Sequence, residues 1–482
     1  MPEINWLAIF PELTLALGAA AVLLVEVQWK PRASTLGWLA GWIVLLAAVF
    51  TVFQWVWAGD QLAAESTGRL VTFSGMFLVD GMAVYGRLAL LGILGLGLAG
   101  AHGLYEALGR RAAEAIAITL LAAAGFSIML SSNNLVLTFL GLEVGSIALY
   151  VLAGLTRERK GSDEAALKYF LLGSFASAMF VYGAALLYAG TGQFEILAIR
   201  DHLAAVIVAR PAVIFIGLGL MLVGLGFKVS AAPFHTWAPD VYQGAPAGIV
   251  GYMAAIAKIG GFITLARIFV TGVIEYHATW APVMAAIAAL SMLIGSVVAL
   301  VQTDVRRMLA YSGIAHAGFA MTGIIGGEIE GVLFYVVAYA VQLIGGFAVI
   351  TAVSGPEGSA SDLSEYRGLW RRNPGLAAGF ALLLFGMAGI PLTSGFIAKF
   401  GVFSDVWATQ PWLVILGVLT SVVTLAFYLR ITVIMYMEGE EGDPIPARAS
   451  TRWVVWIAVG LTILWGVIPG TLLSFVADAF AL

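Results

Sequence analysis

The sequence predicts an all-α, polytopic membrane protein with about fourteen transmembrane helices, and two observations support this prediction. Hydrophobic residues make up 61% of the 482 residues and charged residues only 11%, whereas roughly a quarter of the residues in soluble domains are charged. Apolar runs of about 20 residues, the length that crosses the hydrocarbon core as a helix, recur along the whole chain. The runs are continuous and do not alternate with polar residues, which argues against a β-barrel.

The apolar runs, taken in order between polar breaks, give the centres of the expected helices. They lie near residues 17, 47, 90, 122, 145, 178, 224, 257, 291, 317, 342, 388, 424 and 464. The longest polar connections fall around residues 58–74, 190–211, 354–374 and 438–452, and none of them is long enough to fold as a soluble domain. We therefore expect a single membrane domain over residues 1–482.

Several kinds of site are not expected in this chain. It contains no cysteine, so disulfide bonds, Cys-ligated zinc and iron–sulfur clusters cannot form within it. The net charge of −4 is spread thinly and offers nothing to nucleic acid. No glycine-rich nucleotide loop follows a strand, and we expect neither a bound cofactor or metal nor a redox active site. Residues 1–6 lack the features of a cleaved signal peptide, so we expect the first helix to be retained.

Lysine and arginine are distributed unevenly between the two sets of connections, which predicts the orientation. Fourteen follow odd-numbered helices: Lys30, Arg32, Arg110, Arg111, Arg157, Arg159, Lys160, Arg306, Arg307, Arg367, Arg371, Arg372, Arg448 and Arg452. Only four follow even-numbered helices: Arg69, Arg200, Arg210 and Arg267. We therefore expect the odd connections to face the cytoplasm and both termini to lie on the outer, periplasmic side of the cell's inner (plasma) membrane.

Four charged residues lie well inside apolar runs, where an ionised group costs about 2.5–3.5 kcal/mol on insertion scales. They are Glu143 in the fifth helix, Lys228 in the seventh, Lys258 in the eighth and Lys399 in the twelfth. Arg87 and Arg430 are weaker candidates, since a long arginine side chain can reach an interface. One glutamate cannot neutralise three lysines. Burial disfavours a charged lysine and a nearby carboxylate favours it, so this set suits proton carriers. Structural ion pairs that lock helix packing are the alternative.

Two of the charged helices also contain prolines that predict helix breaks. Pro233 follows Lys228 in the seventh helix, and Pro391 precedes Lys399 in the twelfth. A proline in a membrane helix frees a backbone carbonyl, which is tolerated only beside protein or water. Interrupted helices in corresponding places of two halves indicate a transport site.

The two breaks are five helices apart, so helices 4–8 and 9–13 are expected to form two repeats, inverted because each has an odd number of crossings. The expected segments are 1–110 for helices 1–3, 111–272 and 280–438 for the repeats, and 450–482 for the C-terminal helix. The second repeat lacks a counterpart of Glu143, and its tenth helix offers Tyr311, Ser312 and His316 instead. The predicted orientation puts Lys399 nearer the outer face, which suggests a lateral relay with an outward exit.

Three stretches together resemble the antiporter-like subunits of proton-pumping NADH–quinone oxidoreductase, respiratory complex I. They are GLGFKVSAAPFHTWAPDVYQGAPAGIVGYMAAIAKIGGF at 224–262, ALVQTDVRRMLAYSGIAHAGF at 299–319 and GIPLTSGFIAKF at 389–400. The similarity extends over nearly the whole chain, and the PDVYQGAP run at 239–246 resembles the subunit N group, to which mitochondrial subunit 2 belongs.

The resemblance implies roles for these residues. Glu143 would pair with Lys228, Lys258 would be the central relay and Lys399 the terminal one. His235, His316 and Tyr311 are candidate relay residues in a hydrated path. A helix-break cap is the alternative for His235, and packing is the alternative for His316. The resemblance also implies partner membrane subunits, with NADH, flavin, iron–sulfur clusters and quinone bound by other chains of the complex.

Other functions remain open at this point. A cation/proton antiporter subunit of the multisubunit Na⁺/H⁺ type shares the fold and the charged residues. A passive scaffold subunit would leave the three buried lysines unexplained. A secondary transporter of a small solute would need a substrate pocket.

Overall fold

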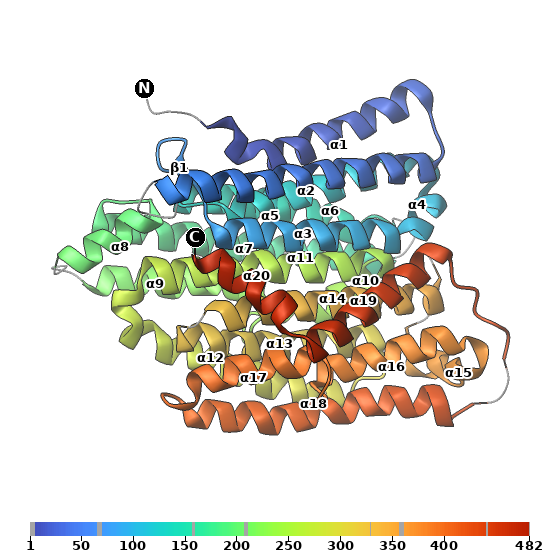
Figure 1. The fold of residues 1–482 in the computed structure, drawn as a ribbon. Coiled ribbons are helices and arrows are strands. Elements are labelled where there is room, and N and C mark those ends of the chain that lie inside the picture. Colours follow the sequence, from blue (N-terminus) through green and yellow to red (C-terminus); the bar gives the residue numbers. More distant parts are fainter. Residues whose placement is uncertain are drawn as a thin grey trace.

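The computed structural model describes residues 5–64, 70–156, 160–206, 211–327, 329–355, 361–439 and 442–481. The helices run side by side across the molecule, from α1 and α2 at the top of Figure 1 to α18 at the bottom. Within the described ranges, thirteen helical segments are long and apolar enough to cross a membrane, and a further crossing is divided between two shorter helices. The prediction of a helical, polytopic membrane protein is therefore confirmed. Arg69, Arg157, Arg159 and Arg210 lie outside the described residues.

The N-terminal part packs α1 and α2 against α3 and α5. Its elements are η1 (Trp6–Ile9), α1 (Phe10–Trp29), α2 (Ala33–Ala64), β1 (Leu70–Thr72), β2 (Phe77–Val79), α3 (Gly81–Gly100), α4 (His102–Leu108) and η2 (Gly109–Arg111). The two short strands pair antiparallel.

Two sets of five crossings follow. The first contains α5 (Ala112–Leu130), α6 (Leu135–Ala153), α7 (Lys160–Thr191), α8 (Ile196–Ala205), α9 (Pro211–Lys228), α10 (Trp237–Gly244), α11 (Ala247–Ala266), η3 (Arg267–Gly272) and η4 (Ile274–Tyr276). The second contains α12 (His277–Leu300), α13 (Val305–Gly326), α14 (Ile329–Ser354), η5 (Leu363–Tyr366), α15 (Leu369–Arg372), α16 (Pro374–Ala388), α17 (Ser394–Trp407) and α18 (Pro411–Met437).

The two sets repeat the same local structure about 170 residues apart. Asn134 caps α6 and forms a backbone bridge to Glu195, and Asp304 caps α13 and bridges to Asp362. The short helices that interrupt the two sets, α8 and α15, lie at opposite ends of the molecule in Figure 1. Five crossings reverse the direction of the chain, so the second set is inverted relative to the first.

Glycine sets the distance between the first two helices of each set. A Cβ on Gly125 of α5 would overlap the backbone of Gly145 on α6. A Cβ on Gly295 of α12 would overlap the backbone of Ala315 on α13 in the same way. The backbones of both helix pairs therefore touch, which leaves the opposite face of α6 and α13 for the polar site.

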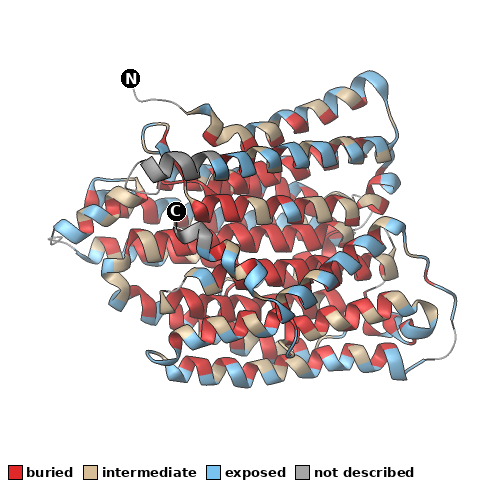
Figure 2. Cartoon of the chain, viewed as in Figure 1, coloured by how far each residue is buried: buried red, intermediate tan, exposed pale blue. Residues whose placement is uncertain are grey.

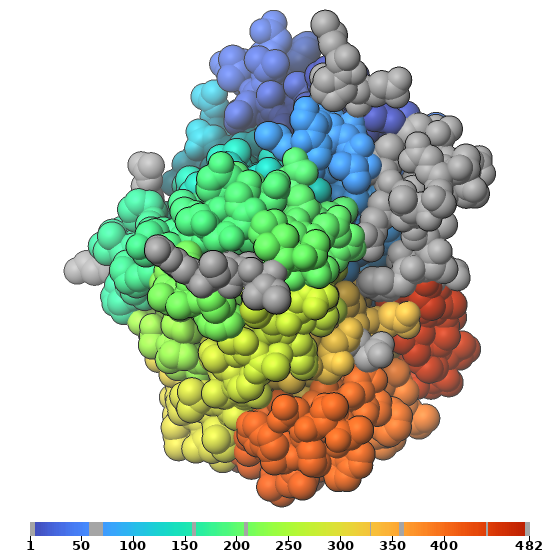
Figure 3. All heavy atoms as spheres, turned by 90° about the vertical axis from the view of Figure 1, so that its left-hand side faces the viewer, coloured from blue at the N-terminus to red at the C-terminus, as the bar shows by residue number. Residues whose placement is uncertain are grey.

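Burial increases towards the middle of the molecule. The spans of α11 and α14 are wholly buried, whereas α1, α2, α18 and α19 expose much of their surface, as the red and pale blue ribbons in Figure 2 show. Figure 3 looks along the helices and shows the N-terminal helices, the first set and the second set following one another down one face. A polar path through α11, α13 and α14 is therefore shielded on all sides by other helices.

The C-terminal span is not one helix. We expected a single helix over 450–482, and the structure has α19 (Ala449–Val467) and α20 (Gly470–Ala481), separated at Pro469. Proline cannot donate a backbone hydrogen bond, which accounts for the division. Both pieces cross the front of the molecule in Figure 1, and α20 packs against α3.

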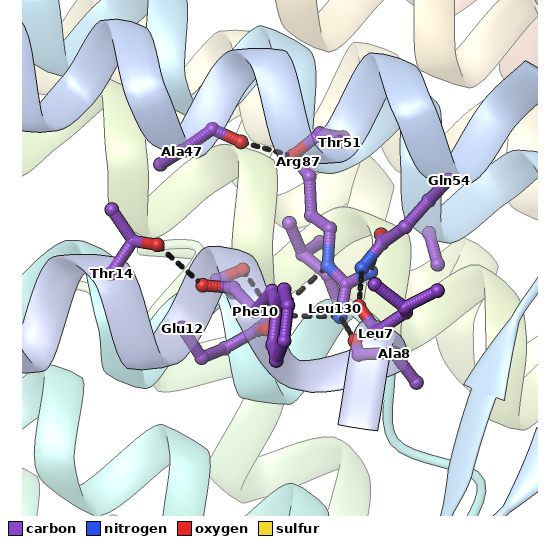
Figure 4. A network of polar contacts seen from close by, with 12 residues as sticks. Leu7, Ala8, Phe10, Glu12, Thr14, Ala47, Thr51, Gln54, Arg87 and Leu130 are labelled. Carbon is purple, nitrogen blue, oxygen red and sulfur yellow. Dashed lines mark hydrogen bonds and ion pairs between the residues drawn. The ribbon is translucent and has the colours of Figure 1, made fainter. Parts of the chain in front are cut away.

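A buried ion pair joins the N-terminal helices, and it corrects one expectation. Arg87 does not reach an interface, because its side chain is 0% exposed and binds Glu12 of α1 at 2.7 Å. The guanidinium also donates to Gln54 of α2 at 2.7 Å and to the Ala8 carbonyl at 3.0 Å. Ser127 of α5 donates to the same Glu12 oxygen at 2.5 Å. Figure 4 shows Arg87 among Ala8, Glu12 and Gln54, which come from separate helices.

Arg430 behaves as expected for the other weak candidate. Its side chain is exposed and donates at 3.0 Å to the Leu300 carbonyl and at 3.3 Å to the Gln302 carbonyl, at the end of α12.

Two arginines counted as loop residues are in fact buried. Arg267 pairs with Asp80 at 2.8 Å, and Arg306 donates to the Ala245 carbonyl at 3.2 Å.

Candidate functional site

The first broken helix consists of α9 and α10, and Lys228 is the last residue of α9. Pro233 lies in the connection between them, where Ser230 adopts a left-handed backbone conformation with φ 63°. Lys228 is 2% exposed. Its Nζ donates to Ser146 Oγ at 2.8 Å and lies 4.8 Å from the centre of the Phe126 ring. The ammonium therefore has one neutral acceptor and two aromatic neighbours, since the centre of the Tyr169 ring lies 5.7 Å from Nζ.

Glu143 lies on α6, one turn before Ser146. Its carboxylate is close enough to attract the Lys228 ammonium. Even so, the structure has no direct ion pair between them, and within the described residues the buried Oε1 of Glu143 accepts no hydrogen bond. The structure thus brings the two residues of the expected pair together, with the Ser146 hydroxyl as the immediate ligand of the lysine.

Lys258 of α11 binds the two repeats at once. It is 3% exposed, and its Nζ donates to the Val229 carbonyl at 2.9 Å and to the Gly313 carbonyl of α13 at 2.8 Å. Val229 is the first residue after α9, so its carbonyl belongs to the negative end of that helix. Gly313 stands 170 residues after Glu143. Gly313 is therefore the residue of the second repeat that is equivalent to Glu143, and Lys258 contacts the second repeat at this position.

The second broken helix consists of α16 and α17. Pro391 lies between them, with Gly389 at φ 84° and Leu392 at φ 71°. Lys399 of α17 is 7% exposed, and its Nζ donates at 2.9 Å to the carbonyl of Ala388, the last residue of α16. The negative end of each first half-helix thus accepts a hydrogen bond from a buried lysine, Lys258 at α9 and Lys399 at α16.

His316 lies between Lys258 and Lys399, in a cluster of hydroxyl groups. Its Nδ1 is 2.8 Å from the hydroxyl of Tyr335, and its Nε2 is 3.4 Å from the hydroxyl of Tyr428. The ring stacks on Tyr339 at 4.1 Å. The Tyr428 hydroxyl also shares a short hydrogen bond with Ser312. The Tyr339 ring also lies 5.9 Å from Lys258 Nζ, and the Phe319 ring, which contacts His316, lies 4.8 Å from Lys399 Nζ.

The other two candidate relay residues lie together. His235 is in the connection between α9 and α10, and its ring centre is 6.5 Å from that of Tyr311 on α13. Within the described residues, His235 Nδ1 is buried and has no hydrogen-bond partner. The two side chains therefore form a pair apart from the His316 cluster.

The three lysines share one electrostatic situation. Within the described ranges, none of them forms an ion pair with a carboxylate, and their hydrogen-bond acceptors are a hydroxyl and three backbone carbonyls. A charged group out of water is stable only if it is paired or neutralised. Dipoles alone compensate a full charge incompletely, so within the described residues no carboxylate partner fixes any of the three lysines in its charged form.

No metal centre is found at this site. Among the described residues, no group of three or more histidine, aspartate or glutamate side chains is arranged to hold a metal ion.

Residues 132–424 match the family model described as NADH:quinone oxidoreductase/Mrp antiporter, TM. The chain belongs to this family. Among curated relatives, the NADH-quinone oxidoreductase subunit N of Salinispora arenicola is 38% identical over 99% of this chain and 98% of its own. The subunit N 1 of Solibacter usitatus is 36% identical over 98% of this chain and 97% of its own.

Solved structures of the NADH:quinone oxidoreductase/Mrp antiporter family have the same fold. A chain of respiratory complex I from Thermus thermophilus is 30% identical and superposes with a TM-score of 0.81, covering 96% of this chain and 99% of that one. A chain of the Mrp complex from Dietzia superposes with a TM-score of 0.84 at 18% identity, over 99% of this chain and 97% of that one, which shows the fold alone. The expected resemblance to complex I subunits is therefore confirmed.

Several residues that surround the buried lysines and His316 were not predicted from the sequence. Ser146, Tyr335, Tyr339 and Tyr428 lie in apolar helices, where a hydroxyl gives no signal that separates a site from a packed core. The one usable signal was the offset of about 170 residues between the repeats. It places Tyr428 at the position equivalent to Lys258, and Ser146 at the position equivalent to His316.

Proposed function

We propose that this chain is a proton-translocating membrane subunit of an NADH-quinone oxidoreductase, in which it couples quinone reduction by the complex to proton transfer across the membrane. The similarity to subunit N of Salinispora arenicola over nearly the full length of both chains supports the assignment. The redox reaction belongs to partner chains, which bind NADH, flavin, iron–sulfur clusters and quinone. This chain moves protons.

One observation carries the proposal. Three buried lysines follow one another through the middle of the protein, and their ligands are a hydroxyl and backbone carbonyls instead of carboxylates. A carboxylate partner would stabilise a permanently charged structural lysine more than dipoles do. Hydroxyl and carbonyl ligands tolerate both the ammonium and the neutral amine, which is what a residue that passes protons requires.

The residues then take these roles. Glu143 modulates the charge of Lys228 through space, from a position one turn before Ser146, whose hydroxyl accepts from Lys228 and donates to the Leu142 carbonyl. Lys258 receives a proton at the centre, and Lys399 releases it towards the outer face. His316 and the tyrosine hydroxyls around it connect the last two lysines. His235 and Tyr311 contribute to a second polar path beside the first break.

The surroundings of the chain follow from the same proposal. It lies in the inner (plasma) membrane among other membrane subunits, with both termini on the outer side. The N and C termini lie on the same side of Figure 1, opposite the arginine-rich α15, which agrees with the bias of lysine and arginine.

The test uses membrane vesicles that carry Lys228→Ala in the complete complex, with Arg200→Ala as the control. Arg200 lies on α8 and pairs with the exposed Asp201 at 2.6 Å. NADH-driven quinone reduction and vesicle acidification are followed together after assembly is checked on a native gel. We expect Lys228→Ala to assemble and to lose most of both activities, while the control keeps them. Retention of both activities by an assembled Lys228→Ala complex would show that the chain is a scaffold.

The nature of the ion is tested separately. Replacing sodium with choline in the same vesicles leaves a proton pump unaffected, whereas a Na⁺/H⁺ antiporter subunit would lose acidification. We expect acidification to persist without sodium.

A further inference from the structure

A narrow apolar groove runs along the outer surface of α2 and α3, away from the buried lysines. Its volume is about 290 Å³, and it is lined by Gly37, Trp38 and Gly41 of α2, Gly95 of α3 and residues at the starts of α4 and α19. A Cβ added at Gly37, Gly41 or Gly95 would meet no atom within 4 Å. The three glycines therefore border open space.

The groove continues into a second cavity at one end of the helices. This cavity of about 440 Å³ shares Ser34 with the groove and is lined by Lys30, Arg32 and Arg110 together with Glu26 and Glu106. By the bias of lysine and arginine, this end faces the cytoplasm. Trp38 lines the groove, and Trp29 and Trp38 are both largely exposed, as expected for residues at a membrane interface.

Positive and negative charges are unbalanced in this second cavity, which forms the mouth of the groove. Arg110 pairs with Glu26 at 3.3 Å, and Glu106 is engaged by Arg448 and His102. Within the described part of the chain, the side chains of Lys30 and Arg32 have no hydrogen-bond or ion-pair partner. Two positive charges thus lie uncompensated where an apolar groove meets the membrane surface.

The length and polarity of the groove suit one kind of occupant. From Ser34 to Gly41 the groove follows α2 for about 10 Å, at 1.5 Å per residue. Its lining is largely apolar along this length, and the charges of Lys30 and Arg32 lie at one end of it. An acyl chain with an anionic headgroup matches both parts, whereas a transmembrane helix of a partner would match only the apolar part.

We propose that the groove and its mouth bind one anionic phospholipid, with an acyl chain between α2 and α3 and the phosphate at Lys30 and Arg32. Basic pockets between helices on the cytoplasmic side recognise anionic headgroups in this way. The lipid would fill the space between the N-terminal helices and α19, which meet at this groove through Ser450.

The experiment measures lipid binding to the purified, delipidated full chain by native mass spectrometry. Phosphatidylglycerol and phosphatidylcholine with the same acyl chains are the two probes. We expect phosphatidylglycerol to bind more tightly, and we expect Lys30→Gln and Arg32→Gln each to weaken it by about fivefold. Neither substitution should change phosphatidylcholine binding. Arg371→Gln, which removes an exposed charge on α15, is the control and should have no effect.

A second pair of variants tests the groove itself. Gly41→Leu fills the open space and should reduce binding of both lipids, whereas Gly460→Leu, at an open position on α19 outside the groove, should not. Equal affinity for the two lipids, or no response to the charge substitutions, would refute an anionic site. Loss of a membrane subunit from the complex on Gly41→Leu, with lipid binding unchanged, would assign the groove to a protein partner and also refute the proposal.

Discussion

Arg87→Met removes the cation from the buried cluster that joins the N-terminal helices. The guanidinium is 0% exposed and bonds to Glu12 at 2.7 Å, to Gln54 at 2.7 Å and to the Ala8 carbonyl at 3.0 Å. In the variant, the Glu12 carboxylate remains out of water, and among the described residues the Ser127 hydroxyl is its one remaining donor. Removing one partner of a buried ion pair costs about 3–5 kcal/mol, because the other charge is left uncompensated.

A double variant separates the energy of the Arg87–Glu12 ion pair from that of the other contacts in the cluster. Glu12→Gln in the Arg87→Met background removes the second charge, so the main cost of the single change disappears. Replacing both members of a buried pair is often close to neutral. We therefore expect the double variant to be more stable than Arg87→Met by about 2–4 kcal/mol, since the Gln54 amide and the Ala8 carbonyl still lose a donor.

Equilibrium unfolding of the purified full chain in mixed detergent micelles measures these free energies. Arg430→Met is the control, because Arg430 also interrupts an apolar helix but is exposed and binds only backbone carbonyls. We expect it to cost less than about 1 kcal/mol. If Arg87→Met proved as stable as Arg430→Met, or if the two changes in the double variant simply added, the cluster would not be a coupled ion pair.

Three further outcomes are expected. Tyr428→Phe removes the hydroxyl that bonds to Ser312 and lies 3.4 Å from His316 Nε2. It should slow NADH-driven quinone reduction by about two- to tenfold, since a hydrogen bond between neutral groups is worth roughly 0.5–1.5 kcal/mol; Tyr436→Phe, farther along α18, should leave the rate unchanged. Gly295→Leu should sharply reduce the amount of folded protein in the membrane, because the leucine side chain would overlap the backbone of α13. Size-exclusion chromatography measures the folded protein, and Gly460→Leu, which faces open space, should be tolerated. Asp240→Asn removes a carboxylate that a lysine of α7 and an arginine of α13 each approach to 2.7 Å. We expect it to cost at most about 1 kcal/mol, with a loss that shrinks at high salt in thermal unfolding, because the group is partly exposed.

Hydropathy was enough to predict where the chain crosses the membrane, because the membrane imposes length and composition on each helix separately. The two breaks were predicted from proline, and the division of the C-terminal helix at Pro469 was missed. It could not separate Arg87 from Arg430. Both stand in apolar runs, and the difference arises from Glu12, which lies 75 residues before Arg87 in the sequence and touches it only after α1 and α3 have packed. A partner of this kind is a property of the tertiary structure.

The same limit applies to the candidate site. Lys228, Lys258 and Lys399 were conspicuous because charge is costly in an apolar run. The hydrogen-bond acceptors of these lysines were not visible in the sequence, since backbone carbonyls carry no sequence signal. The prolines at positions 233 and 391 gave the only indication that free carbonyls would be present.

The two repeats differ at the position that decides how charge is handled. In the first repeat a glutamate stands near the lysine of the broken helix, whereas in the second the equivalent residue is Gly313, whose carbonyl accepts a hydrogen bond from Lys258. The path proposed for the proton therefore changes character between the repeats. A proton on Lys228 would be supported by a nearby carboxylate, whereas one on Lys258 or Lys399 would be supported by helix-end dipoles.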